Sequence, residues 1–376
     1  MFTAFEPSGD AHAATVIRAL VQRHPEFLIY AWGGPAMEAA GATVIERTAE
    51  DGSMGLGALS KARQVRRHIK AIKRWSKEYR VVAHVPVDSP AANFPICKVL
   101  RKAGARTIHL VAPQLWAWGG WRKRKLRKRT NLLLCLLPFE EQWFNDRNIP
   151  ARFIGHPMIN RDIEPDDLHH TAGMLPQAAP KLAIFPGSRM QEVRKNIGLL
   201  MKCFDELQTR HADLCGIVCC ARPQILKYIK KRFEAPPTSL HFVTVDPDVA
   251  VYWCDCALTV SGTMSLGIAR QLKPMVGVYR VGWIGKLISM VMLRTKHRLL
   301  PNIVAGERIV PEFVPYAGGP MPIVHALSPI VADTRVAMRH SAALRVMCSQ
   351  FDGHDPGNEA ADLIALVAGG ETIETE

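Results

Sequence analysis

The stretch Leu182–Arg189 reads LAIFPGSR, an apolar run followed by a Pro-Gly turn and a polar helix start. The apolar run favours a buried strand, and proline and glycine end it. Ser188 and Gln191 have the S-x-x-Q spacing of a capping box, which predicts a helix beginning at Ser188. Strand, tight turn and helix form the repeating unit of parallel α/β domains.

This alternation runs along the whole chain and restarts after a turn-rich, acidic segment. With 376 residues the chain is too long for one ordinary core. We therefore expect an α/β protein with two Rossmann-like, doubly wound domains facing a central cleft. The predicted divisions are an N-terminal domain over 1–160, a linker over 161–180, a C-terminal domain over 181–335, and helices over 336–376 that pack back on the N-terminal domain.

The predicted strands are short apolar runs bounded by turn residues. In the first half they cover Phe2–Phe5, Phe27–Trp32, Arg80–Val87, Arg106–Val111, Asn131–Leu136 and Ala151–Ile154. In the second half they cover Leu182–Phe185, Leu214–Cys220, Leu240–Val245, Ala257–Val260 and Pro274–Val278.

The composition excludes several classes of protein. Hydrophobic residues make up 48% and charged residues 22%, which is ordinary for a globular chain. No apolar run approaches the ~20 residues that cross a bilayer, and the first residues lack a basic signal-peptide start. Nine cysteines in apolar surroundings do not form a disulfide scaffold, and their spacing matches no usual zinc pattern. We expect a cytoplasmic protein that is soluble or peripherally attached, without a metal or other cofactor.

The net charge of +14 is concentrated in one region. Residues 51–130 hold 20 Lys and Arg against 3 Asp and Glu. The basic residues mix with tryptophans in WAWGGWRKRKLRKR (residues 116–129) and with aliphatic residues in 61–77 and 270–298. This mixture favours an anionic membrane surface as partner. A solvated charged face is the simpler alternative, and nucleic acid is disfavoured because no recognisable binding module accompanies the charge.

In parallel α/β sheets, ligands bind beyond the carboxyl ends of the strands. Polar residues directly after predicted strands are therefore the candidate site. Asp88 ends a strand and is placed as a general base. Arg189 and the adjacent helix start suit a diphosphate, although a capped helix with an exposed arginine is an equally good interpretation of those residues alone. The remaining candidates are Glu6 and Ser8 after the first strand, His156 at the domain junction, and the Ser261-Gly262-Thr263 loop.

An acidic pair and a histidine have simpler interpretations. Asp246-Pro-Asp248 resembles a metal-binding D-x-D, but Asp248 is better explained as a helix N-cap. For His156 a hydrogen-bonded structural histidine is the safer interpretation.

Beyond these single sites, a set of motifs occurs in a characteristic order from Glu6 to Val314. They are EPSGD (6–10), GGPAM (33–37), MGL (54–56), VDSPAANF (87–94), APQLWAW (112–118), LPFE (137–140), FIGHP (153–157), PGSRxxE (186–192), SGT (261–263), KPMVGVYR (273–280) and LPNIVAGERIVPE (300–312). In this respect the chain closely resembles the lipid-A-disaccharide synthases, peripheral-membrane glycosyltransferases of the GT-B fold.

The resemblance implies a defined reaction. An acylated glucosamine unit is transferred with inversion from UDP-2,3-diacylglucosamine to the 6-hydroxyl of 2,3-diacylglucosamine 1-phosphate (lipid X), at the inner membrane of a Gram-negative cell. By resemblance Asp88 is the base, supported by Glu6 and Ser8. The UDP-binding residues are then Gly187, Ser188, Arg189, Glu192, Ser261, Gly262, Thr263 and Asn302.

Two positions depart from the family pattern. Gly267 stands where a glutamate usually holds the nucleotide ribose, and Ala91 replaces a second carboxylate after Asp88. These departures leave open the alternative of a membrane-bound relative with impaired catalysis. A related transferase that uses UDP-GlcNAc is a further alternative.

Overall fold

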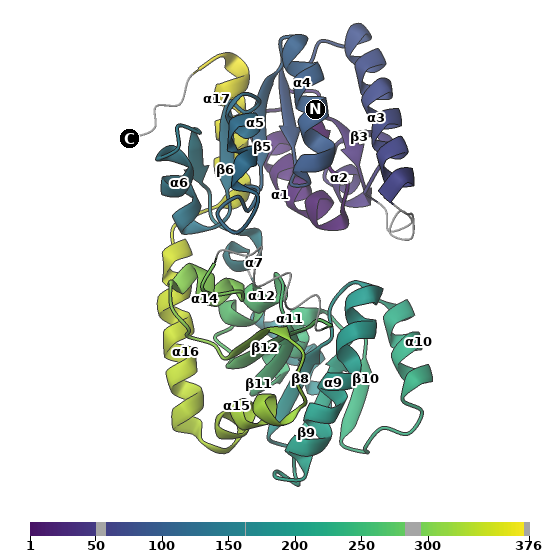
Figure 1. Cartoon of the computed structure of the whole chain (residues 1–376), viewed down its shortest axis with the longest axis vertical. Coiled ribbons are helices and arrows are strands. Elements are labelled where there is room, and N and C mark those ends of the chain that lie inside the picture. Colours follow the sequence, from purple (N-terminus) through teal and green to yellow (C-terminus); the bar gives the residue numbers. More distant parts are fainter. Residues whose placement is uncertain (50–57, 162, 283–294, 372–376) are drawn as a thin grey trace. The chain divides into compact units, whose positions relative to one another are not determined.

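The computed structural model describes residues 1–49, 58–161, 163–282 and 295–371 (Figure 1). These residues form two compact units. Unit 1 consists of Met1–Asn160 and Phe351–Glu376, and unit 2 consists of Arg161–Gln350. Where the structure is described, none of the helices is both long and apolar enough to cross a bilayer.

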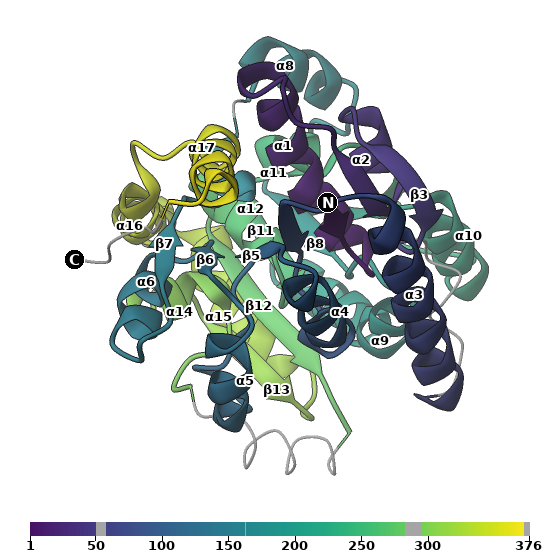
Figure 2. The ribbon, with the colours of Figure 1, turned by 90° about the horizontal axis from the view of Figure 1, so that it is seen from above.

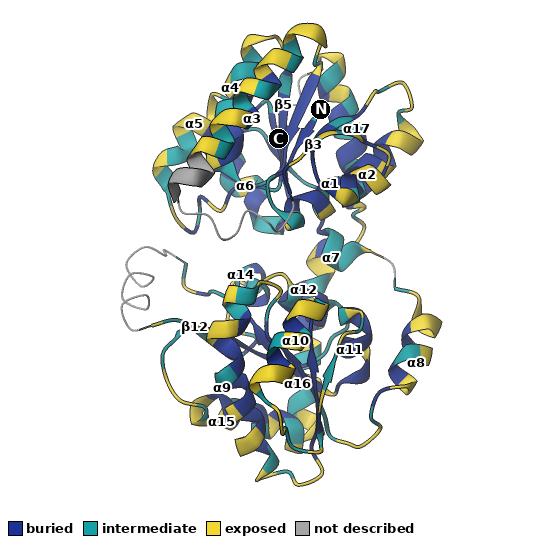
Figure 3. Ribbon diagram, turned by 90° about the vertical axis from the view of Figure 1, so that its right-hand side faces the viewer, coloured by how far each residue is buried: buried dark blue, intermediate teal, exposed yellow. Residues whose placement is uncertain are grey.

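Unit 1 is built on a seven-stranded sheet with the order β3-β2-β1-β4-β5-β6-β7. All neighbouring strands in its described ladders run parallel. The strands are β1 (Phe2–Thr3), β2 (Tyr30–Gly33), β3 (Thr43–Arg47), β4 (Ala83–Pro86), β5 (Arg106–Leu110), β6 (Leu132–Cys135) and β7 (Ala151–Phe153). The inner strands are buried on both faces, as helix-covered parallel strands require (Figure 3).

The helices of unit 1 cover this sheet, and most begin on a proline whose fixed φ suits the first helical position. They are α1 (Pro7–Arg23), α2 (Pro35–Ala39), α3 (Ala58–Glu78), α4 (Pro90–Lys102), α5 (Lys123–Arg127), α6 (Pro138–Asn145), α7 (Pro157–Asn160) and α17 (Pro356–Gly369). Helix α3 packs beside α4 (Figure 2). Between α3 and the sheet, the rings of Trp32 and Trp75 meet edge to face at 5.2 Å.

Unit 2 repeats the design with a six-stranded parallel sheet of order β10-β9-β8-β11-β12-β13. Its strands are β8 (Lys181–Phe185), β9 (Cys215–Cys219), β10 (Leu240–Val243), β11 (Cys256–Val260), β12 (Met275–Arg280) and β13 (Glu312–Tyr316). Its helices are α8 (Pro165–Gly173), α9 (Met190–Gln208), α10 (Pro223–Arg232), α11 (Pro247–Trp253), α12 (Met264–Arg270), α14 (Leu300–Ala305), α15 (Met321–Ala332) and α16 (Thr334–Cys348). The two sheets confirm the expected α/β class.

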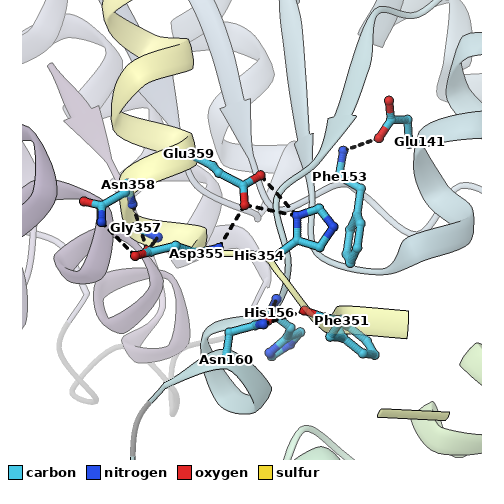
Figure 4. A network of polar contacts seen from close by, with 10 residues as sticks. All are labelled: Glu141, Phe153, His156, Asn160, Phe351, His354, Asp355, Gly357, Asn358 and Glu359. Carbon is cyan, nitrogen blue, oxygen red and sulfur yellow. Dashed lines mark hydrogen bonds and ion pairs between the residues drawn. The ribbon is translucent and has the colours of Figure 1, made fainter. Parts of the chain in front are cut away.

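The C-terminal residues return to unit 1, where α17 packs lengthwise against α1. Asp355 caps α17, and Glu359 accepts a hydrogen bond from the Asp355 N–H at 2.8 Å (Figure 4). The chain leaves unit 1 after Asn160 and returns to it at Phe351. The Asn160 side chain donates a hydrogen bond to the Phe351 carbonyl at 2.7 Å, so these two points are joined. Helix α16 stays in unit 2 and packs on α12.

The segment 161–180, expected as a linker, contains helix α8, which packs against α11. Arg161, the first residue of this segment, is also held by an ion pair. Arg161 and Arg270 both pair with the carboxylate of Asp248, the Arg270 contact being 2.7 Å long. The N-cap of α11 is Asp246, whose carboxylate accepts the Asp248 N–H at 2.8 Å. The expected N-cap role of Asp248 was therefore wrong by two residues.

Candidate active site

In unit 1 the strand order reverses between β1 and β4. From this point the chain winds outward in both directions, so the loops that follow β1 and β4 separate and leave room for a ligand. The first loop carries Glu6 and Ser8, and the second carries Asp88. The two loops start close together. Gly9, just after the first loop, lies so near Val87 that a Cβ on Gly9 would be 3.6 Å from Val87 Cγ1. The structure thus brings Glu6, Ser8 and Asp88 to one edge of one sheet.

Asp88 is half-buried and has an unusual backbone. Asp88 (φ 45°) and Ser89 (φ 42°) are consecutive non-glycine residues in the left-handed region. The Asp88 N–H donates to the Leu110 carbonyl at 3.0 Å. Such conformations cost free energy and persist only where surrounding contacts impose them. This turn connects β4 to α4 and holds Asp88 just beyond the carboxyl end of β4, where the strand order reverses.

Glu6 and Ser8 lie at the start of α1, which begins at Pro7. Glu6 is the N-cap, and Ser8 is exposed in the first turn. Asp10 instead has a structural role. Its buried carboxylate accepts the N–H groups of Gly34 (2.8 Å), Ala36 (2.9 Å) and Met37 (3.2 Å), the start of α2.

His12 was missed by the sequence reasoning. Burial lowers the pKa of His12, and the negative charge of Asp88 opposes that shift, so the two side chains act on each other. The His12 ring meets that of His156 edge to face at 5.8 Å. His12 lies four residues after Ser8 and so on the same face of α1, a spacing that could have revealed it.

His156 is a structural histidine, as the safer interpretation held. Its Nδ1 accepts the Met158 N–H at 3.0 Å, and burial lowers its pKa to about 3. The preceding Gly155 has φ +78°, and a Cβ there would lie 2.7 Å from both Asn160 Oδ1 and His354 Cβ. The FIGHP motif therefore serves the junction with the returning C-terminal segment.

In unit 2 the strand order reverses between β8 and β11. The loop after β8 contains Gly187, Ser188 and Arg189, and the loop after β11 contains Ser261, Gly262 and Thr263. A Cβ on Gly187, which has φ +104°, would lie 3.8 Å from Val260 Cγ1, so these loops are also neighbours.

Arg189 is the N-cap of α9, which begins at Met190, and its carbonyl accepts the N–H groups of Glu192 and Val193. The predicted capping box at Ser188 does not form, because α9 begins two residues later than expected and Ser188 precedes its N-cap. Arg189 Nη1 lies 3.2 Å from Glu192 Oε1. Burial raises the pKa of Tyr279, Glu192 adds to the shift and Arg189 opposes it, which places the end of β12 at the same site.

The second loop of unit 2 is open to solvent. Gly262 and Thr263 are exposed, and Ser261 extends the ladder by donating its N–H to the Val278 carbonyl at 2.9 Å. Gly267 lies buried within α12.

Asn302, the remaining predicted residue, lies at the start of α14. It is fully buried, and its amide both donates to and accepts from the Val310 backbone, at 2.9 and 2.8 Å. These bonds close the loop between α14 and β13, and the assignment of Asn302 to the UDP-binding residues stays a prediction.

In the part of the chain that the structure describes, no group of three or more His, Cys, Asp or Glu side chains is arranged to hold a metal ion. Cys219, Cys220, Cys254 and Cys256 of unit 2 are all buried. Burial raises the pKa of the first three to about 12, and it raises the pKa of Cys256 well above its usual value. Thiols in this state pack as small apolar groups.

A family model described as lipid-A-disaccharide synthetase matches residues 1–352. The chain belongs to the lipid-A-disaccharide synthase family. A lipid-A-disaccharide synthase from Pseudomonas syringae pv. syringae is 30% identical, over 97% of this chain and 96% of the relative.

Solved structures share the fold of this family member. The Staphylococcus aureus MnaA–UDP co-structure has a TM-score of 0.65 at 12% identity, covering 100% of this chain and 98% of that one. Arabidopsis thaliana UGT89C1 complexed with quercetin has a TM-score of 0.65 at 10% identity, covering 98% of each chain. These structures show that the chain has the GT-B fold. As a member of the lipid-A-disaccharide synthase family, it is a hexosyltransferase of lipid A biosynthesis that takes a nucleotide sugar.

Proposed function

We propose that this enzyme transfers 2,3-diacylglucosamine from its UDP derivative to lipid X, with Asp88 as general base and Arg189 on the diphosphate. The acceptor 6-hydroxyl oxygen attacks the anomeric carbon of the donor. Its proton passes to the Asp88 carboxylate, and the bond from the anomeric carbon to the phosphate oxygen breaks. UDP leaves with that electron pair, giving a β(1→6) disaccharide 1-phosphate.

The observation that carries this proposal is that each unit presents one type of group at its own switch point. Unit 1 offers a half-buried carboxylate at Asp88, with Glu6 and Ser8 on the neighbouring loop. A direct displacement with inversion needs one base, and Asp88 supplies it.

Unit 2 offers the complementary chemistry for the leaving group. The N-terminus of the 19-residue helix α9 presents N–H groups, and Arg189 stands at its cap. Both favour a diphosphate and stabilise the charge that develops as UDP departs. We assign Gly187 and Ser188 to the same subsite, Glu192 to orienting Arg189, and Ser261, Gly262 and Thr263 to the rest of the nucleotide.

We further propose that unit 1 attaches peripherally to the anionic face of the inner membrane, where the acyl chains of both substrates lie. Trp121 is 73% exposed and Trp118 40% exposed, beside the seven basic residues of 122–129. The Arg122 guanidinium lies 4.0 Å from the Trp118 ring centre. Exposed tryptophans among cations are typical of surfaces that insert at the headgroup level. The basic, aliphatic stretch 283–294 lies outside the described residues.

Trp121→Ala is expected to weaken binding to phosphatidylglycerol-containing vesicles by roughly tenfold, because burial of a large aromatic side chain contributes about 1.5–3 kcal/mol. Co-sedimentation measures this. Val346→Ser is the control, since Val346 is 71% exposed on α16 of unit 2 and does not belong to the basic cluster. Unchanged binding by Trp121→Ala, or equal binding of the parent to neutral vesicles, would contradict the membrane proposal.

A further inference from the structure

A chain of buried polar side chains lies beneath Asp88. Thr3 on β1, His84 on β4 and Asn93 on α4 are each fully buried. The Asn93 amide nitrogen lies 3.1 Å from the Val87 carbonyl oxygen and 2.8 Å from that of Asp88. Thr3 Oγ1 lies 2.7 Å from Asn93 Oδ1 and 2.9 Å from His84 Nε2. These side chains connect two adjacent strands to the turn that holds the proposed base.

The backbone carbonyls of Val87 and Asp88 determine the direction of every hydrogen bond in this series. Two backbone carbonyls can only accept, so the Asn93 NH2 group must face them and donate to both. Asn93 Oδ1 then accepts the single proton of the Thr3 hydroxyl. Thr3 Oγ1 must therefore accept from His84, which carries its proton on Nε2. Burial lowers the pKa of His84 well below its usual value, so this arrangement persists throughout the neutral range.

The turn needs such support. Two consecutive left-handed residues without glycine cost about 1–2 kcal/mol each, and Asp88 and Ser89 are such a pair. The Asp88 N–H donates to the Leu110 carbonyl of β5. The carbonyl oxygens of Val87 and Asp88 both accept hydrogen bonds from the Asn93 amide.

We propose that Asn93 is a positioning residue for the Asp88 carboxylate, and that Thr3 and His84 fix the orientation of its amide. This inference rests on the proposed role of Asp88 as base. Asn93 acts through the turn: with its amide in place, the Asp88 carboxylate is held where it can take the acceptor proton. Without the two donated bonds the turn relaxes toward ordinary backbone angles and the carboxylate moves.

The test is a double-mutant cycle on turnover, measured as UDP release by the full chain with acylated donor and acceptor. Asn93→Asp keeps the side-chain volume but replaces the donor with an acceptor. We expect kcat to fall by about ten- to a hundredfold, with UDP affinity and the KM for the donor unchanged. Added to Asp88→Asn, the same substitution should cost no further turnover, because a group that acts through Asp88 has nothing left to position.

Asn145→Asp is the matched control. Like Asn93, Asn145 both donates and accepts through its side-chain amide; its partner is the backbone of Ala151 in the same unit, at 3.3 and 2.9 Å. The Asn145→Asp substitution should leave turnover unchanged. If Asn93→Asp does not fold, Thr3→Val replaces it, since it removes only the hydroxyl that orients the amide, and a three- to tenfold fall in kcat is expected.

The outcomes separate this inference from the proposed function. If Asn93→Asp and, where needed, Thr3→Val leave kcat unchanged, or if either lowers turnover equally in the Asp88→Asn background, Asn93 has no positioning role, while the base assignment stands. If Asp88→Asn itself turns over normally, the proposed function fails first and the inference fails with it.

Discussion

Asp88→Asn is expected to lower kcat between about a hundredfold and ten-thousandfold, the usual contribution of a positioned general base. An amide of the same shape cannot take the proton of the acceptor hydroxyl. The oxygen must then attack while still protonated, so the barrier rises at the chemical step. The affinity for UDP should not change, because the nucleotide is assigned to the loops of unit 2. Initial rates of UDP release and calorimetry with UDP measure the two quantities separately.

Asp352→Asn is the control for this experiment. Asp352 is an exposed carboxylate in the same unit, outside both switch-point loops, and its loss should leave turnover unaltered. Near-normal turnover by Asp88→Asn, with substrate binding intact, would remove Asp88 from the mechanism.

Arg189→Ala should weaken UDP binding by about ten- to a hundredfold, because hydrogen bonds to a charged group contribute about 1.5–3 kcal/mol. It should lower kcat as well, since the negative charge on the departing diphosphate grows toward the transition state. Arg189→Lys keeps the charge but loses the planar fork that binds two phosphate oxygens at once. Its affinity is expected to fall between those of the parent and the alanine variant.

Arg194→Ala provides the matched control for charge. Arg194 is exposed on the same helix and lies over the Tyr228 ring, 5.6 Å from its centre, rather than at the helix start. Calorimetry should give nearly the parent UDP affinity for this variant. An Arg189→Ala protein that binds UDP as tightly as Arg194→Ala would show that the cap of α9 is not the diphosphate subsite. Absence of UDP binding by the parent itself would favour the alternative of an impaired relative.

The inner strands were predictable because they are short, apolar and bounded by turns. The two strands that the sequence did not reveal, β3 and β13, both lie at sheet edges. Residues of β3 alternate between exposed and half-buried, and β13 contains Pro315 with no residue fully buried. An edge strand pairs on one side only, so it can lack the apolar signal of a buried strand, although the edge strands β7 and β10 retain enough of it to be predicted.

The part of the candidate site that directly follows strands was predictable, because the end of a strand determines where the next residues lie. Asp88 and Arg189 follow β4 and β8 closely and lie at the two switch points. The roles of Asp10 and Asn302 depend on hydrogen bonds to Gly34 and Val310, and such partners have no local pattern. Asn93 is similar, because its bond to Thr3 spans 90 residues.

The most direct test of this account is a product assay on the full-length chain with defined substrates. Incubation with UDP-2,3-diacylglucosamine and lipid X should release one UDP for each β(1→6) disaccharide formed, and neither product should appear when the acceptor is omitted. If the acylated pair gives no disaccharide while unacylated UDP-GlcNAc is turned over, the proposed substrates and the proposed reaction are contradicted.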